Sequence, residues 1–563
     1  MKSVKYSKLV SLFFCTGVLV TSCTKLDQSL NSSLTNSQAA NSLGANGTQL
    51  LLQTAYNDIG NPYSDLGNIF TLEEVTADQA LVPTRGSDWD DGGIFRVLHR
   101  HEFKADGVGN IINQFNNLNK INFDATNVLA FNPTKVQAAE ARFLRAFALY
   151  QLLDLFGQFP FRNPGDNLLN APEVLSGEEA FQFIVSELTD IMPDLNASTN
   201  AATDEMGKTK ANKDAANFLL MRLYLNHGAF VNRANPSFAD ADMQKVITLG
   251  NDIINSGRYG YNAKFFDNFN PTNSKSPEGI FAYPNYSGVT TNNSDIRSYW
   301  WSPLHYNHVP SNFANPVSGW NGFSTVAEFY NSFGVNTPAT QTPADTLLDQ
   351  RIGGRFYPNC TEIAGIRPGL LIGQQYNQNG GKYKDRKGND LVYLPTIAAD
   401  LKETNNATLE RTGIRIVKYP PDYTGGAPYP NYGERKAGNW VMLFRYSEVV
   451  LMVAEAKMRA ATPDNVGALA LVNELRAVRG ASPMAAPLVL VNPANIYDPK
   501  TFLAERGREL YWEAVRRTDL IRFGMFLKPF AYKTTTSDPK YLVFPIPTPA
   551  LAANPNLVQN PGY

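Results

Sequence analysis

Residues 446–480, YSEVVLMVAEAKMRAATPDNVGALALVNELRAVRG, contain two helical patterns separated by a short linker. In the first pattern Val449, Met452 and Val453 recur at the spacing of one face of an α-helix. Apolar residues also cover much of the remaining circumference, which is typical of a helix packed between neighbours. The span of about 34 residues is that of a tetratricopeptide-like helical hairpin, although the full consensus is absent. This stretch therefore predicts a stacked helical-repeat scaffold.

The same periodicity predicts further helices on both sides of a central region. It is clearest at 133–156, where Asn132 can cap the helix, Pro133 suits its first position, and Gly157 can end it. Similar patterns cover 48–59, 109–130, 176–192, 212–229, 240–256, 442–461, 464–479, 500–514 and 516–527. We therefore expect a mostly α protein.

The central region, from about 258 to 440, lacks helical periodicity. Asn, Gly, Pro and Tyr dominate it, with short strand-like runs between turns. Its aromatic content argues against disorder, and irregular stretches of this length in compact proteins are usually functional. We expect one unit over 49–563, with a helical scaffold at 49–257 and 440–527. Long irregular loops and a few short strands would form a ligand-binding insert at about 258–440.

The N-terminus carries the pattern of an export signal. Lysines precede an apolar stretch at 9–20 that is too short to span a bilayer. The small residues before Cys23 resemble a bacterial lipoprotein cleavage box. We therefore expect removal of residues 1–22, lipidation of Cys23 and a polar tether over 23–48. The alternative is a soluble exported protein with an incidental cysteine.

Charge and cysteine content exclude several classes of function. The 563 residues include 50 Lys+Arg and 51 Asp+Glu, a net charge of −1 that argues against nucleic-acid binding. The three cysteines, Cys15, Cys23 and Cys360, cannot form a disulfide framework or a cysteine-based zinc site. His99 and His101 alternate as on a strand, but no third ligand is evident, so we expect a structural pair. We expect no metal and no cofactor.

Glu505, Glu509 and Glu513 share one face of a predicted helix, at i, i+4 and i+8. Paired carboxylates can cleave a glycosidic bond. The arginines interleaved with these glutamates are Arg506, Arg508, Arg516 and Arg517. This mixture favours ion pairs that tie helices together over catalysis.

Several segments together resemble the SusD/RagB family of outer-membrane lipoproteins. They are residues 139–150 with 155–160, 446–459 with 473–476, 505–523, and 544–547 with 554–562. The resemblance implies a tetratricopeptide-like scaffold carrying irregular loops. It also implies oligosaccharide binding at the bacterial surface, docked on a TonB-dependent β-barrel importer (SusC-like), without enzymatic activity. Ala514 stands where the family often has Gly and Thr518 where an aromatic is common, both inside an expected helix.

Two loop segments combine aromatic with polar side chains, as a sugar site requires. Aromatic faces match the C–H faces of sugar rings, and Asp, Asn and Arg can bond their hydroxyls. The predicted contacts are Trp300, Trp301, Trp320, Tyr299 and Arg297 in 285–323, and Trp89, Asp78 and Asp90 in 76–93, a segment that also holds Arg85. The alternative is that each tryptophan is buried against the scaffold and anchors a loop there, which we expect of Trp440 and Trp512.

The favoured function is a cell-surface lipoprotein of the outer membrane that captures oligosaccharides for an importer. One alternative is a surface glycoside hydrolase that uses Asp88, Asp90 or a helix glutamate. Another is a helical-repeat scaffold that binds protein or peptide. The sequence does not name the sugar, because stacking geometry depends on loop conformation.

Overall fold

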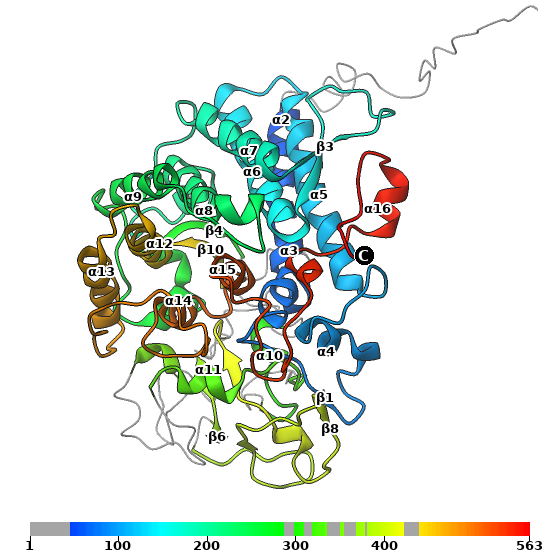
Figure 1. Ribbon diagram of the computed structural model, residues 1–563, viewed down its shortest axis with the longest axis vertical. Helices are drawn as coiled ribbons and strands as arrows, with labels where there is room; N and C mark the ends of the chain where they lie inside the picture. The colour runs from blue at the N-terminus through cyan, green and yellow to red at the C-terminus, as the bar shows by residue number, and fades with distance from the viewer. Residues whose placement is uncertain are drawn as a thin grey trace, which may run out of the picture.

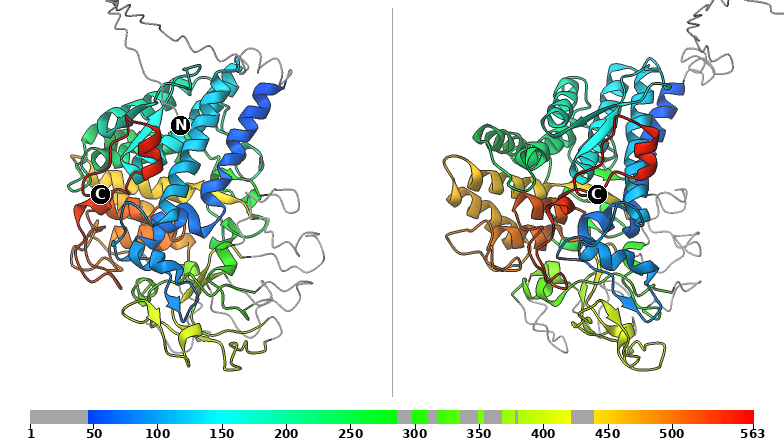
Figure 2. Two further views of the ribbon diagram at one scale, coloured as in Figure 1. Left: turned by 90° about the vertical axis from the view of Figure 1, so that its right-hand side faces the viewer. Right: turned by 45° about the vertical axis from the view of Figure 1, so that its right-hand side comes forward.

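Long helices fill the upper part of the molecule, and irregular loops with two-stranded pairings fill the lower part (Figure 1). The computed structural model describes residues 46–285, 298–308, 318–334, 349–353, 368–377, 380–420 and 439–563. The turned views in Figure 2 show the same division between helices and loops. The prediction of a mostly α fold with a few short strands is confirmed.

The scaffold is a tetratricopeptide-like series of helices, each packed against the next. In packing order they are α2 (Gly47–Asp58), α5 (Gly109–Leu129), α6 (Lys135–Phe156), α7 (Gly177–Ile191), α8 (Lys213–Val231), α9 (Asp240–Ile254), α12 (Tyr446–Arg459) and α13 (Asn465–Val478). Helix α12 thus packs directly on α9, although the whole insert separates them in sequence. Gly250 of α9 allows this approach, because a Cβ there would lie 2.2 Å from Cγ2 of Val453 on α12.

Local capping sets the ends of α6. The Thr134 hydroxyl accepts a hydrogen bond from the Gln137 N–H at 3.3 Å, and the Gln137 side chain accepts one from the Thr134 N–H at 3.0 Å. Gly157 ends the helix with φ 72, a conformation that glycine adopts without strain. The prediction that Asn132 is the cap is wrong, because Thr134 makes both bonds.

Strand β10 (Val441–Arg445) replaces the first residues of the helix predicted at 442–461. It pairs antiparallel with β4 (Gly279–Tyr283), and every residue of both strands is buried. Its Val, Leu and Phe side chains suit a pleated, buried strand, so the pairing overrides the local helical pattern. The pairing also brings together the two ends of the insert.

The helices predicted at 500–514 and 516–527 are shorter in the structure. They are α14 (Phe502–Leu510) and α15 (Arg516–Arg522). Between them Trp512 and Ala514 have φ 61 and φ 57, so the chain turns there instead of continuing as a helix. The expectation that Ala514 lies in a helix is wrong; it occupies a left-handed position that favours glycine.

Glu509, near the end of α14, is fully buried. It accepts hydrogen bonds from Arg351, Arg445 and Arg479 at distances of 3.2, 3.0 and 2.9 Å. Burial alone would raise the pKa of Glu509, but the positive charges of Arg479, Arg445 and Arg351 outweigh burial and hold that pKa at about 2. The interpretation of this glutamate as an ion-pair residue is confirmed.

The two neighbouring glutamates extend the same buried network. Glu505 accepts a hydrogen bond from Arg351 at 2.9 Å. Glu513 lies beyond the end of α14, so the prediction of three glutamates on one helical face is wrong for this residue. The turn after α14 nevertheless brings Glu513 within 2.6 Å of Lys418 Nζ and of Arg445 Nη2. The network therefore joins α14 to both the insert and β10.

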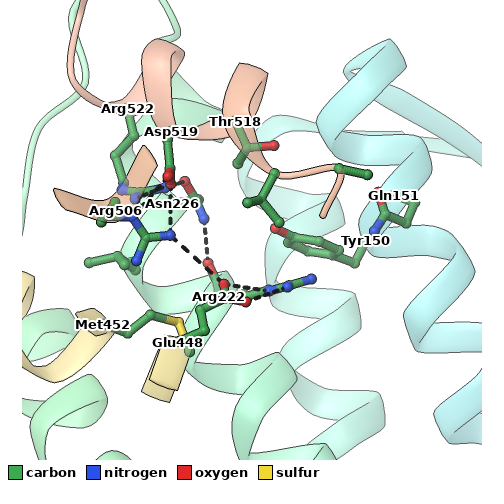
Figure 3. Close-up of a pocket in the computed structure, with 13 residues that line it drawn as sticks. Tyr150, Gln151, Arg222, Asn226, Glu448, Met452, Arg506, Thr518, Asp519 and Arg522 are labelled. Atoms are coloured by element: carbon green, nitrogen blue, oxygen red, sulfur yellow. Dashed lines mark hydrogen bonds and ion pairs between the residues drawn. The ribbon is translucent and has the colours of Figure 1, made fainter. Parts of the chain in front are cut away.

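A second buried network joins α15 to α8 and α12 (Figure 3). Arg522 donates hydrogen bonds to Asp519 at 2.6 Å and to Asn226 at 2.8 Å. Beside them, Arg222 of α8 donates to Glu448 of α12 at 2.7 Å. The cavity among these side chains measures about 10 Å³, room for one water molecule at most. This part of the molecule is structural and too small for a ligand.

Replacing Glu509 with Ala should lower the free energy of unfolding by about 3–5 kcal/mol, because the buried network would lose one negative charge that three arginines share. Chemical denaturation followed by circular dichroism measures this loss. Glu179→Ala, at an exposed position on α7, is the matched control. Equal stability of the two variants would contradict a structural role for Glu509.

Candidate functional site

The insert places two of the predicted tryptophans in a stack. The Trp320 N–H donates to the Trp301 carbonyl oxygen at 2.9 Å, so segment 318–322 lies against segment 301–304. The two indole rings lie 4.8 Å apart between centroids, with 20° between their planes. Trp320 is 43% exposed, whereas Trp301 is 2% exposed. Trp301 is therefore the buried base on which Trp320 presents an indole to solvent.

Trp89 joins the stack at an angle from a neighbouring loop. Its Nε1–H donates to the Trp320 carbonyl oxygen at 2.7 Å, and the two ring centroids are 6.1 Å apart. Phe95 and Phe323 pack edge-on against Trp89 at 5.6 and 5.5 Å. We call Trp89, Trp301 and Trp320 the aromatic platform. Gly322 lies so close that a Cβ there would be 2.3 Å from the Trp89 ring.

Charged and hydroxyl groups border the aromatic platform beside Trp89. The Arg386 guanidinium lies 3.8 Å from the Tyr306 ring centroid, and its Nη2 is 3.3 Å from Asp88 Oδ2. Its Nε donates to Glu410 at 2.7 Å, while the Tyr306 hydroxyl donates to Asp88. About half of the Arg386 side chain remains exposed. Arg386 and Glu410 were not predicted, because only the fold brings them beside Asp88.

Two buried arginines bind the segment that carries Trp320. Arg85 Nη1 donates to the Asn321 carbonyl oxygen at 2.6 Å, and Arg415 Nη2 donates to the Asn321 side chain at 2.7 Å. Both guanidinium groups also donate to Ser324 Oγ at 2.8 Å. Burial and the charge of Arg415 lower the pKa of Arg85. Arg85, a polar residue of the predicted segment 76–93, is thus a support of the platform and not a ligand contact.

Three further predicted contacts are buried, so the structure removes them from the candidate set. The Asp78 carboxylate accepts hydrogen bonds from Arg516 at 2.7 and 2.8 Å. The Tyr299 hydroxyl donates to the Tyr63 carbonyl oxygen at 3.0 Å. Trp300 is 2% exposed and packs in a small apolar cluster of the insert. Each of these side chains fixes a loop to its surroundings.

The remaining predicted site residues have different outcomes. Asp90 is exposed beside Trp89 and pairs with Arg96 at 2.9 Å, so it borders the aromatic platform. Arg297 and the lipidation residue Cys23 lie outside the described residues.

The histidine pair is structural. His99 ends helix α4 (Ile94–His99) and His101 follows with φ 56, so the prediction that they alternate on a strand is wrong. Both ring nitrogens of His99 lie within 3.0 Å of backbone carbonyl oxygens, and burial lowers the pKa of both residues. In the part of the chain that the structure describes, no group of three or more His, Cys, Asp or Glu residues could hold a metal ion.

Comparison with known proteins finds relatives by sequence. The family model described as the SusD family matches residues 277–563. The starch-binding protein SusD of Bacteroides thetaiotaomicron is 27% identical over 456 residues, which cover 78% of this chain and 75% of that protein.

Solved structures share the fold. A SusD superfamily protein from Parabacteroides distasonis matches with a TM-score of 0.64 and 17% identity, over 94% of this chain and 100% of that chain. Surface glycan-binding protein A from Bacteroides thetaiotaomicron, in complex with laminarihexaose, matches with a TM-score of 0.59 and 16% identity. That alignment covers 92% of this chain and 99% of the other.

Replacing Gly322 with Ala should displace the Trp89 ring, because the new methyl group would overlap it. We expect a loss of about 1–3 kcal/mol in the free energy of unfolding, as for overpacked cores, and a changed near-ultraviolet circular dichroism spectrum. Gly260→Ala is the matched control, because nothing lies within 4 Å of a Cβ at that position. An unchanged spectrum for Gly322→Ala would contradict the close packing of the platform.

Proposed function

The chain belongs to the SusD family, and from this premise we propose that it binds glycans at the bacterial cell surface. The observation that carries the proposal is the exposed indole of Trp320 on its buried partner Trp301. One relative is named a starch-binding protein, and another was solved with laminarihexaose. Glucans are therefore the first ligand class to test.

The aromatic platform suits a sugar for two physical reasons. The electron-rich indole face attracts the polarised C–H groups of a pyranose ring. Asp88, Asp90 and Arg386 lie at its border and offer charge-assisted hydrogen bonds to ring hydroxyls. Because Trp301 and Trp89 already fix the Trp320 backbone and ring, a ligand would meet a preorganised surface and order few side chains on binding.

Glu505, Glu509 and Glu513 fit an ion-pairing role better than catalysis. Glycoside hydrolysis requires a general acid with a raised pKa beside a second carboxylate. Burial would raise the pKa values of Glu505, Glu509 and Glu513, but the neighbouring cations lower all three below their ordinary range. The family consists of carbohydrate-binding, non-catalytic proteins, so the chain is not an enzyme.

We further propose an outer-membrane location with a lipid on Cys23, and delivery of the glycan to a SusC-like TonB-dependent importer. The lipoprotein-like residues before Cys23 and the family membership support this proposal. None of the helices that the structure describes combines the length and the apolar composition of a membrane span.

Removing the Trp320 side chain should weaken glycan binding by roughly thirtyfold or more, because a central aromatic contact typically contributes about 2 kcal/mol. A glycan array, followed by calorimetric titration of its strongest ligand, compares Trp320→Ala with the wild type. Its melting temperature should change little, because the indole is 43% exposed.

Two further variants serve as controls for that result. Trp300→Ala should lower the melting temperature, because Trp300 is buried. Leu50→Ala removes an exposed apolar side chain outside the site and should change neither property. Normal glycan binding by Trp320→Ala would contradict the proposal that the aromatic platform binds the glycan.

Replacing Cys23 with Ala should release the protein from the membrane fraction or leave its signal segment uncleaved, because no thioether lipid can form. Cell fractionation and intact-mass measurement check both outcomes. Cys360→Ala is the control, because that cysteine lies far from the cleavage box in sequence. Wild-type protein without lipid mass would contradict the anchor.

A further inference from the structure

A second pocket lies beside the C-terminal half of α5, in the helical upper part of Figure 1, whereas β1 (Thr84–Arg85) and α10 (Ser298–Trp301) lie in the lower part. Its volume is about 270 Å³. One wall is a face of α5, and the other is the loop between β2 (Gln158–Phe161) and β3 (Glu173–Ser176). The pocket shares no lining residue with the aromatic platform.

The α5 wall combines amide side chains with an aromatic ring. Asn119, Asn122, Phe123, Thr126 and Asn127 follow the i, i+3, i+4, i+7 and i+8 spacing of a single helical face. Phe123 is 48% exposed, which is unusual for a phenylalanine and leaves its ring accessible at the pocket. This helix face therefore offers both hydrogen-bonding groups and an apolar surface.

The loop wall is held in place by its own hydrogen bonds. Arg162 Nη1 donates to the Asn167 carbonyl oxygen at 3.1 Å, and the Asn163 N–H donates to Asp166 at 2.8 Å. Phe161, at the base of the loop, is 8% exposed and packs on Phe183 with 4.9 Å between ring centroids. These contacts fix the wall before any ligand arrives.

Asn122 ties the two walls of the pocket together. It is 7% exposed and its Nδ2 donates to the Pro160 carbonyl oxygen at 2.9 Å. Its Oδ1 is buried and accepts no hydrogen bond from any described residue. This oxygen has almost no accessible surface, so it lies behind the pocket wall and is not a contact for a ligand.

We propose that this pocket is a second saccharide site, which takes one pyranose ring. Its volume is slightly below the range for drug-sized ligands, which starts at about 300 Å³, so it suits a smaller ligand. A purely apolar ligand would cover the polar groups of Thr126 and Asn127 in the pocket wall without offering them hydrogen bonds. An anion would meet Asp166 as well as Arg162. A neutral ring with hydroxyl groups can hydrogen-bond these polar groups while its C–H face contacts Phe123.

Ligand-observed saturation-transfer NMR on the full chain tests the inference. The probes are the methyl glycosides of glucose, galactose, mannose and N-acetylglucosamine, with maltose and cellobiose. At least one probe should bind the wild type and Trp320→Ala equally, and should bind Phe123→Ala at least tenfold more weakly. Phe123→Ala should remain folded, because the ring is half exposed, and Leu50→Ala is the matched control.

The outcomes separate this inference from the proposed function. A signal lost in Phe123→Ala but kept in Trp320→Ala supports the second site, whatever the platform binds. A signal lost only in Trp320→Ala places the sugar on the platform and overturns the second site. If no probe gives a signal that depends on Phe123, the second site is also overturned, while array binding lost in Trp320→Ala would still support the platform.

Discussion

The buried carboxylate of Glu509, surrounded by Arg351, Arg445 and Arg479, is the interaction on which the arrangement of the C-terminal half depends. A charge removed from water is tolerated only when counter-charges and hydrogen bonds surround it. These three arginines come from the insert, from β10 and from the end of α13. One helix can keep its glutamates buried only when all of those segments are in position.

This constraint extends to the irregular insert, which has few regular elements of its own. The β4–β10 pairing joins the ends of the insert, and Lys418 and Arg351 bind it to α14 and to Glu513 beyond that helix. Nearer the surface, Arg85 and Arg415 hold the segment that carries Trp320. In this protein, buried Arg and Lys side chains that bind oxygen atoms of distant segments hold the loops together. Hydrogen-bonded sheets have that role in other folds. A loop-rich surface can thereby be rigid enough to preorganise an aromatic site.

Exposure separates the tryptophans that hold loops from the one that can meet a ligand. Trp300, Trp440 and Trp512 are at most 4% exposed, whereas Trp320 is 43% exposed. The α5 pocket follows the same principle, because Phe123 is exposed where the other aromatic residue of that pocket, Phe161, is buried. In both places an accessible ring lies beside polar groups. The two sites would give the molecule two separate regions that can contact a glycan.

The sequence alone determined the helical scaffold, because apolar spacing and capping are local properties that a few consecutive residues carry. The pattern of 446–480, the stop at Gly157 and the ion-pairing character of Glu509 were all predictable in this way. Local patterns failed where distant partners compete: β10 became a strand because β4 pairs with it, and α14 stopped before Trp512. Only the tertiary structure decided which aromatic side chains face solvent. Trp301 and Trp320 stack on each other, yet Trp301 is buried and Trp320 is exposed, because exposure depends on which distant segments pack on each ring.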